Sequence, residues 1–276
     1  MMSNLDGAMP LRVIVLGMLI ARPMLAQEIG HRAEDTSAVV TEASGRTAAL
    51  VVGEHLEYDV RFGKLRVGRG SMSIRAISDV RGREAWHTVL AISGGIPFFR
   101  VDDRLESWID TRTFTSLRLA QQTRQGRYHR ERHIEFFPDR AAMLEHRDGA
   151  LEEATVAEPL DEGALLYFVR TLPLNVGDRY SLDRYFKPDR NPVLLDVVRR
   201  ERVQVPAGTF ETIVIRPTIR SPGIFAESGE AEVWVTDDER RLMVQMKAKL
   251  SFGTLSLSLR SISNVAGTPL AATLTP

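Results

Sequence analysis

The feature that most constrains this chain is an alternation of apolar and polar residues with a period of two. It is clearest in residues 53–74, which read GEHLEYDVRFGKLRVGRGSMSI. The apolar members are Leu56, Tyr58, Val60 and Phe62, followed after a Gly-Lys pair by Met72 and Ile74. Alternation places these side chains on one face of a strand, so the segment predicts a strand, a tight turn and a second strand.

Similar alternating runs recur along the chain between turn signals, which is typical of an antiparallel β protein. They cover residues 84–93, 103–111, 114–122, 128–137, 141–147, 193–205, 211–220, 231–238, 242–252 and 254–263. The link VPAGTF at 205–210 predicts a hairpin turn, with Pro206 presetting φ and Gly208 at the end of the turn.

Two of these hairpins resemble each other. Residues 106–119 and 232–246 each contain a Trp on a strand, an Asp/Thr-rich turn and a second strand. Asp and Thr side chains satisfy backbone groups of turns, so both segments predict the same local structure. Any two hairpins can look alike, which is the competing interpretation.

One segment, PLDEGALLYFVRTLPL at 159–174, lacks the period of two. Asp161 can cap a helix, with Leu160 positioned to pack on Leu165, and Pro173 ends it. Residues 164–169 are apolar on all sides, so a helix over 161–171 is predicted to be buried on all sides. A central strand is the alternative.

Composition narrows the function. The chain has 276 residues, 43% of them apolar, with 36 basic against 36 acidic residues and no cysteine. Zero formal charge argues against a general nucleic-acid or anionic-membrane binder. The lack of cysteine excludes disulfides, thiolate chemistry, Cys-ligated zinc and the lipid-modified cysteine of a lipoprotein. We expect no cofactor and no metal.

The amino terminus resembles a signal peptide. Arg12 precedes the apolar run 13–21, and Ala26 offers a small residue before Gln27; Met9 is an alternative start to Met1. The run is too short to span a bilayer. We therefore expect a signal peptide at 1–26, a flexible leader at 27–50, a single β-rich domain at 51–264 and a tail at 265–276, in a protein that is periplasmic or otherwise exported and has no transmembrane span after signal removal.

A family resemblance extends over residues 53–262. GEHLEYDVRFGKLRVGRGSM, DRLESWIDTRTFTSLRL, GRYHRER, DEGALLYFVRTLPLNVGDRY, VPAGTF and VWVTDDERRLMVQMKAKLSFGTLSLSL stand in the order and spacing of domain of unknown function 3108. Its members are bacterial, mostly exported, and have no established activity. The Trp-turn hairpins also resemble those of periplasmic lipoprotein-carrier half-barrels. The resemblance implies a mainly β fold: a long curved antiparallel sheet, forming a half-barrel or open barrel around a buried helix near 161–171.

Two groups of residues are candidates for ligand binding. The segment GGIPFFRVDD at 94–103 is an apolar loop that predicts either a rim over a cavity or a lid belonging to the core. With the helix it supplies the apolar candidates Ile96, Phe98, Phe99, Tyr167 and Phe168. A basic run supplies Arg127, Arg130 and Arg132 as candidates for contact with an anionic group, or as exterior charges paired with Glu131 and Glu135.

No catalytic residue can be assigned. His129 and His133 share a strand face but lie about 13–14 Å apart at about 3.4 Å per residue, too far to bind one metal ion together. There is no G-x-S-x-G or P-loop motif. The sequence favours a non-enzymatic envelope protein that binds a lipid, another amphiphile or an envelope-assembly partner. The alternatives are a hydrolase or other enzyme acting on envelope polysaccharide, and a structural partner-binding module without ligand.

Overall fold

The computed structural model describes residues 39–40, 50–147, 149–220, 225, 230–250 and 253–264. The expected signal peptide at 1–26 and tail at 265–276 lie outside the described residues. So does the expected leader at 27–50, apart from Val39, Val40 and Leu50. Among the described residues, no helix is both long and apolar enough to cross a bilayer.

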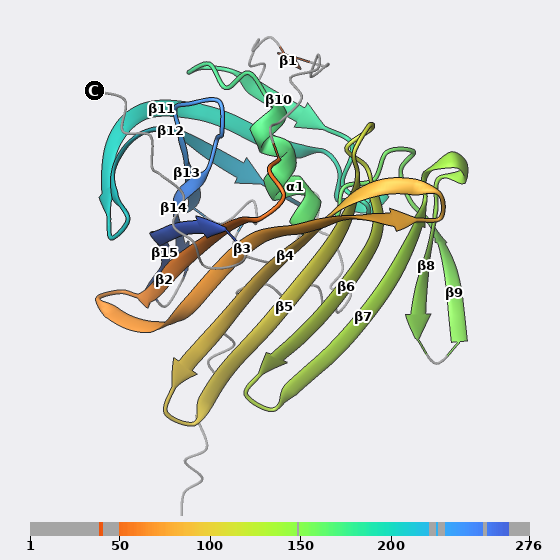
Figure 1. The fold of residues 1–276 in the computed structure, drawn as a ribbon, viewed down its shortest axis with the longest axis horizontal. Coiled ribbons are helices and arrows are strands. Elements are labelled where there is room, and N and C mark those ends of the chain that lie inside the picture. Colours follow the sequence, from red (N-terminus) through yellow and green to blue (C-terminus); the bar gives the residue numbers. More distant parts are fainter. Residues whose placement is uncertain are drawn as a thin grey trace, which may run out of the picture.

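The described strands form one curved sheet of 15 strands in the order β1-β10-β11-β12-β13-β14-β15-β2-β3-β4-β5-β6-β7-β8-β9 (Figure 1). They are β1 (Val39–Val40), β2 (Glu54–Phe62), β3 (Leu65–Val80), β4 (Arg83–Ile96), β5 (Phe99–Asp110), β6 (Ser116–Gln125), β7 (Tyr128–Phe137), β8 (Ala142–Arg147), β9 (Gly149–Ala154), β10 (Arg179–Leu182), β11 (Val193–Val205), β12 (Gly208–Thr218), β13 (Glu230–Thr236), β14 (Met243–Leu250) and β15 (Gly253–Asn264). Among these described strands, the one parallel pairing is that of β1 with β10. The expected mainly β fold with an open, curved antiparallel sheet is confirmed.

The alternation seen in the sequence divides the sheet into an inner and an outer face. Cross-strand partners such as Tyr58 and Gly70, or Leu90 and Leu105, lie opposite each other in the register and are buried. The inner side chains of β2 to β5 and β11 to β15 join one apolar core. The apolar face of the 53–74 ribbon therefore covers the interior of the curved sheet.

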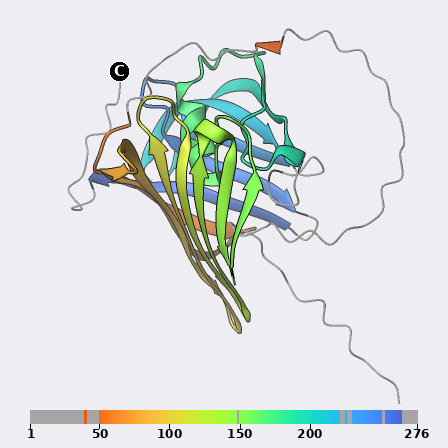
Figure 2. The same ribbon diagram turned by 90° about the vertical axis from the view of Figure 1, so that its right-hand side faces the viewer.

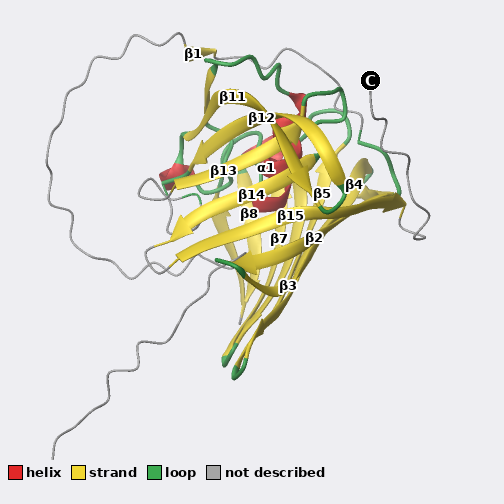
Figure 3. Cartoon of the chain, turned by 90° about the vertical axis from the view of Figure 1, so that its left-hand side faces the viewer, coloured by secondary structure: helices red, strands yellow, loops and turns green. Residues whose placement is uncertain are grey.

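The helix fills that interior. Helix α1 (Glu162–Phe168) continues into a 3₁₀ turn, η2 (Val169–Thr171), and Figure 3 shows it enclosed by the sheet. Its amino terminus is capped by Asp161, whose Oδ1 accepts hydrogen bonds from the backbone N–H of Gly163 and Ala164 at 2.8 and 2.9 Å. The predicted capped and buried helix is confirmed.

Two contacts attach the helix to the strands that precede it by about 100 residues. The Arg170 guanidinium forms a two-pronged ion pair with Glu54 of β2, at 2.7 and 3.1 Å. The Tyr167 hydroxyl donates to the Ser73 carbonyl of β3 at 3.4 Å. These polar contacts lie within the core, so they set the position of the helix along the sheet.

The two Trp-turn hairpins have the same local structure. Oδ1 of Asp110 accepts from the backbone N–H groups two and three residues later, and Oδ1 of Asp238 does the same. Both hairpins also contain a register shift beside the Trp, after Trp108 and after Trp234. The similarity read from the sequence is thus a shared turn chemistry.

Several hairpin turns lie at one end of the sheet. Gly63–Lys64 joins β2 to β3, Pro97–Phe98 joins β4 to β5, and Gly126–Arg127 joins β6 to β7. Figure 2 shows the β4–β5 and β6–β7 hairpins extending past the rest of the sheet. The predicted hairpin at 205–208 is also present, with Gly208 at φ +136°.

Candidate functional site

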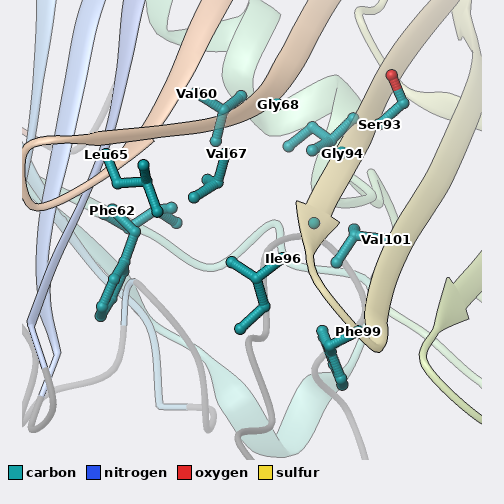
Figure 4. Close-up of a pocket in the computed structure, with 13 residues that line it drawn as sticks. Val60, Phe62, Leu65, Val67, Gly68, Ser93, Gly94, Ile96, Phe99 and Val101 are labelled. Carbon is teal, nitrogen blue, oxygen red and sulfur yellow. The ribbon is translucent and has the colours of Figure 1, made fainter.

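An apolar pocket opens at the hairpin end of the sheet. Its volume is about 270 Å³. It lies between the β2–β3 hairpin and the β4–β5 hairpin (Figure 4), and Leu255 of β15 also lines it. The lining residues are Val60, Phe62, Leu65, Val67, Gly68, Ile92, Ser93, Gly94, Gly95, Ile96, Phe99, Val101 and Leu255.

Glycines on facing strands create the hollow. Gly68 of β3 and Gly94 of β4 lie directly opposite each other in the register. A Cβ atom at Gly68 would lie 2.3 Å from the Ser93 carbonyl oxygen, and one at Gly94 would lie 2.2 Å from the Val67 carbonyl oxygen. The two backbones approach too closely for any side chain. Because no side chains fill this part of the inner wall, a cavity remains between the neighbouring apolar residues.

The chemistry of the pocket is almost entirely that of hydrocarbon. Ser93 is the one lining residue with a polar side chain, and it is exposed; Figure 4 shows its hydroxyl directed away from the opposite wall. Small-molecule sites normally add a few polar groups that orient the ligand. A pocket without them selects by shape and hydrophobicity, which suits an acyl chain or a similar apolar group. The pocket also lacks the acid–base groups that hydrolysis needs.

Two of the candidate ligand residues line this pocket and three do not. Ile96 and Phe99 belong to its wall. Phe98 lies in the turn between them, fully exposed, with its backbone at φ +68°. Tyr167 and Phe168 are buried in the core, 1% and 5% exposed. Burial raises the pKa of the Tyr167 phenol well above its usual value.

The segment 94–103 is not a loop. Gly94, Gly95 and Ile96 complete β4, Phe99 begins β5, and only two residues form the turn. Gly94 and Gly95 are paired within the sheet, and their φ values of +155° and +138° accompany a close approach of the neighbouring strands. The segment forms the pocket wall as part of the sheet.

The three candidate arginines do not form one surface. Arg127 is exposed in the β6–β7 turn. Arg132 is 2% exposed and donates to both carboxylate oxygens of Glu145, at 2.9 and 3.4 Å. Arg130 lies 3.7 Å from the same carboxylate. Alternation turns Arg130 and Arg132 to the inner face of β7, so neither can join Arg127 in an exterior patch.

Sequence reasoning missed the larger part of the pocket. Val60 and Val67 come from the β2–β3 hairpin, whereas Val101 comes from β5 and Leu255 from β15, far away in the sequence. The sequence signal that could have indicated the pocket is the presence of glycines inside strand patterns, at Gly68 and Gly70 and again at Gly94 and Gly95. It identifies a gap in the side-chain layer, but not the residues that surround it.

Comparison with known proteins identifies the family of this chain. The sequence profile described as protein of unknown function (DUF3108) matches residues 57–260, which is most of the chain. This chain belongs to the DUF3108 family. A search of curated proteins finds no match. The expected family is therefore confirmed.

One solved structure supports the fold of this DUF3108 protein. It is similar to a β-barrel-like protein of domain of unknown function DUF1849 from Brucella abortus, with a TM-score of 0.50 and 9% identity. That alignment covers 78% of this chain and 98% of the other. A second match is the hypothetical protein CT021 from Chlamydia trachomatis, with a TM-score of 0.38, 8% identity, and coverage of 82% and 92%. At such low identity the first match bears on the fold alone.

Next to the pocket, one buried carboxylate interrupts the apolar interior of the DUF3108 sheet. Asp103 is the next inward residue after Val101 on β5, and it is 1% exposed. Its carboxylate accepts from the Gln125 side chain at 2.6 Å and from the backbone N–H of Arg124 at 3.1 Å. Burial raises the pKa of Asp103 to about 6, although the two hydrogen bonds by themselves would lower it.

A second buried carboxylate, Asp161, accepts from the hydroxyls of Ser107 and Ser116 at 2.6 and 2.7 Å. Oδ1, which accepts from Ser107, also caps helix α1, and Oδ2 accepts from Ser116. His87 binds Glu106 at 2.7 Å and stacks on Trp108 with ring centroids 4.4 Å apart, on the outer face of the sheet. The Ser–Asp contacts thus have a structural role as a helix cap, and His87 faces away from them.

Proposed function

We propose that this DUF3108 protein binds an apolar or amphiphilic ligand, with one acyl chain or a comparable apolar group in the pocket between the β2–β3 and β4–β5 hairpins. The observation that carries the proposal is an apolar pocket whose wall includes exposed residues. Leu65 is 61% exposed and Ile96 is 39% exposed. A ligand that covers these side chains removes their apolar surface from water, and this burial contributes a favourable free energy of binding.

The size of the pocket limits the ligand. Its volume of about 270 Å³ lies just below the usual range of roughly 300–1,000 Å³ for small-molecule sites. It suits one chain rather than a whole lipid, so the polar head of an amphiphile would remain at the mouth. Ile96 and Phe99 would contact the chain, whereas Tyr167 and Phe168 would support the core behind it.

Binding is tested with a fluorescent fatty-acid probe. Val67 is partly buried and lines the pocket, so Val67→Phe should fill it and weaken probe binding about tenfold or more. Val203→Phe is the matched control: Val203 is also partly buried on a strand, but it lies on β11 and does not line the pocket. Equal binding by Val67→Phe and wild type would contradict the proposal. If probes of several chain lengths fail to bind wild type at high micromolar concentration, a partner-binding module becomes the better explanation.

We also propose that the protein is exported. Arg12, the apolar run 13–21 and the small residue Ala26 before Gln27 support cleavage of a signal peptide. The mature protein should begin at Gln27 or at pyroglutamate derived from it, which mass spectrometry of the protein from an envelope fraction can measure. An intact Met1 or Met9 terminus on protein from the periplasm would exclude this cleavage.

A further inference from the structure

The hairpin end of the sheet carries apolar side chains that project into solvent. Phe98 lies at the tip of the β4–β5 hairpin and is fully exposed. Ile96, at the end of β4, and Leu65, the first residue of β3 after the β2–β3 turn, are exposed as well. Figures 1 and 2 show the β4–β5 hairpin among the elements that project furthest from the helix-filled part of the sheet.

The backbone conformation of Phe98 is unfavourable for a residue with a large side chain. Its φ is +68°, in the left-handed region. Pro97 precedes it, and a two-residue turn that begins with Pro normally has Gly or Asn at the next position. A bulky side chain with positive φ costs free energy, and strain of this kind is concentrated at functional sites. Here the strained residue is a phenylalanine whose side chain lies in solvent and does not pack in the core.

The same end is strongly basic. Residues 61–69, 93–102 and 124–127 contain seven basic residues against one acidic residue, Asp102, whereas the whole chain is balanced at 36 against 36. All seven are exposed: Arg61, Lys64, Arg66, Arg69, Arg100, Arg124 and Arg127. Among the described contacts, Arg66 is paired with Asp59 at 3.0 Å. The positive charge is therefore gathered around the apolar tips.

We propose that this hairpin end docks on the surface of an anionic phospholipid bilayer. Basic residues are attracted to anionic headgroups, and isolated apolar side chains enter the boundary between headgroups and acyl chains. A protein partner would need a matching cavity for each projecting side chain, whereas a bilayer accepts them without one. Leu65 and Ile96 also belong to the pocket wall, so docking would bring the mouth of the pocket to the membrane.

Vesicle flotation without added ligand tests the docking surface. Wild type should float with vesicles of phosphatidylcholine and phosphatidylglycerol at 70:30, bind less at raised salt, and bind weakly to phosphatidylcholine alone. Phe98→Gly removes the apolar tip and relieves the positive φ. It should lower partitioning about tenfold and leave the melting temperature unchanged or higher.

Charge is tested with a matched pair of double variants. Arg100→Gln/Arg127→Gln should lower partitioning roughly tenfold or more, at about 1 kcal/mol for each basic residue near an anionic surface. Arg75→Gln/Arg112→Gln removes the same charge from exposed positions away from the tips and should change it less than twofold. Equal losses in the two double variants would mean that net charge, not this surface, drives binding.

Three outcomes overturn the proposal. They are no flotation of wild type with anionic vesicles at low salt, wild-type binding by Phe98→Gly, and loss of flotation in the pocket-filled variant Val67→Phe. The last would mean that vesicle lipid binds through the pocket. Flotation of Val67→Phe together with loss of probe binding separates the docking surface from the ligand site, so either proposal can fail alone.

Discussion

Breaking the buried ion pair between Arg170 and Glu54 should cost a large share of the stability of the fold. The two side chains are 5% and 4% exposed and come from η2 and β2, 116 residues apart. Arg170 also donates from Nε to the Arg240 carbonyl at 2.8 Å. Glu54→Leu removes one partner and leaves the guanidinium buried with that carbonyl as its remaining acceptor.

Removing one partner of a buried pair costs about 3–5 kcal/mol, because the remaining charge has lost both its solvent and its counterion. Domains of this size are stable by roughly 5–15 kcal/mol. The loss corresponds to a fall of about 10 °C in the melting temperature. Glu54→Leu/Arg170→Leu removes both charges and should be less destabilised than either single variant, since no unpaired charge is left buried.

Urea unfolding followed by circular dichroism measures these differences. The control is Glu230→Leu, which breaks the pair between Lys249 and Glu230, at 3.1 Å, with both side chains more than two-thirds exposed. Its cost should stay below about 1 kcal/mol. A loss of less than 1 kcal/mol for Glu54→Leu, or a double variant that is less stable than both singles, would refute the reasoning.

Three further predictions concern stability. Asp161→Ala removes the helix cap and the acceptors of two serine hydroxyls, and should lower the free energy of unfolding by about 2 kcal/mol or more, whereas a loss below 0.5 kcal/mol by urea unfolding would mean that the cap is dispensable. Gly208→Val places a β-branched residue at φ +136° and should cost on the order of 1–2 kcal/mol, with Ala207→Val in the same turn as the control for bulk; an unchanged melting temperature would contradict it. The pKa of Asp103 is raised from 3.8 to about 6 in the folded protein. Between these two pH values the folded protein therefore binds a proton that the unfolded chain does not bind. The resulting stabilisation of the fold is complete below about pH 4 and is lost as the pH rises through 6. The stability difference between wild type and Asp103→Asn should therefore shift against wild type by about 1 to 3 kcal/mol between pH 4 and 7, and a difference independent of pH would show that Asp103 titrates normally.

Local patterns predicted most of the secondary structure because they depend on neighbours in sequence. The period of two identified each long strand from β2 to β8 and from β11 to β15, and Asp161 with Pro173 bounded the helix. The strands that were missed are β1, β9 and β10, with two, six and four residues. β1 and β10 contain too few alternations to be recognised. β9 is as long as β8 but lies at the edge of the sheet, where pairing with a single neighbouring strand determines it.

The sequence by itself determined the long strands and the capped helix, because these depend on residues close together in the chain, and it determined the family through the order and spacing of short motifs. Only the tertiary structure decided the candidate site. It turned Arg132 inward to Glu145, directed Phe98 outward, and brought Val60, Val101 and Leu255 around the gap between Gly68 and Gly94. The curvature and the register of the sheet determine which strands, distant in sequence, face each other across the interior. A pattern of neighbouring residues contains no information about these long-range contacts.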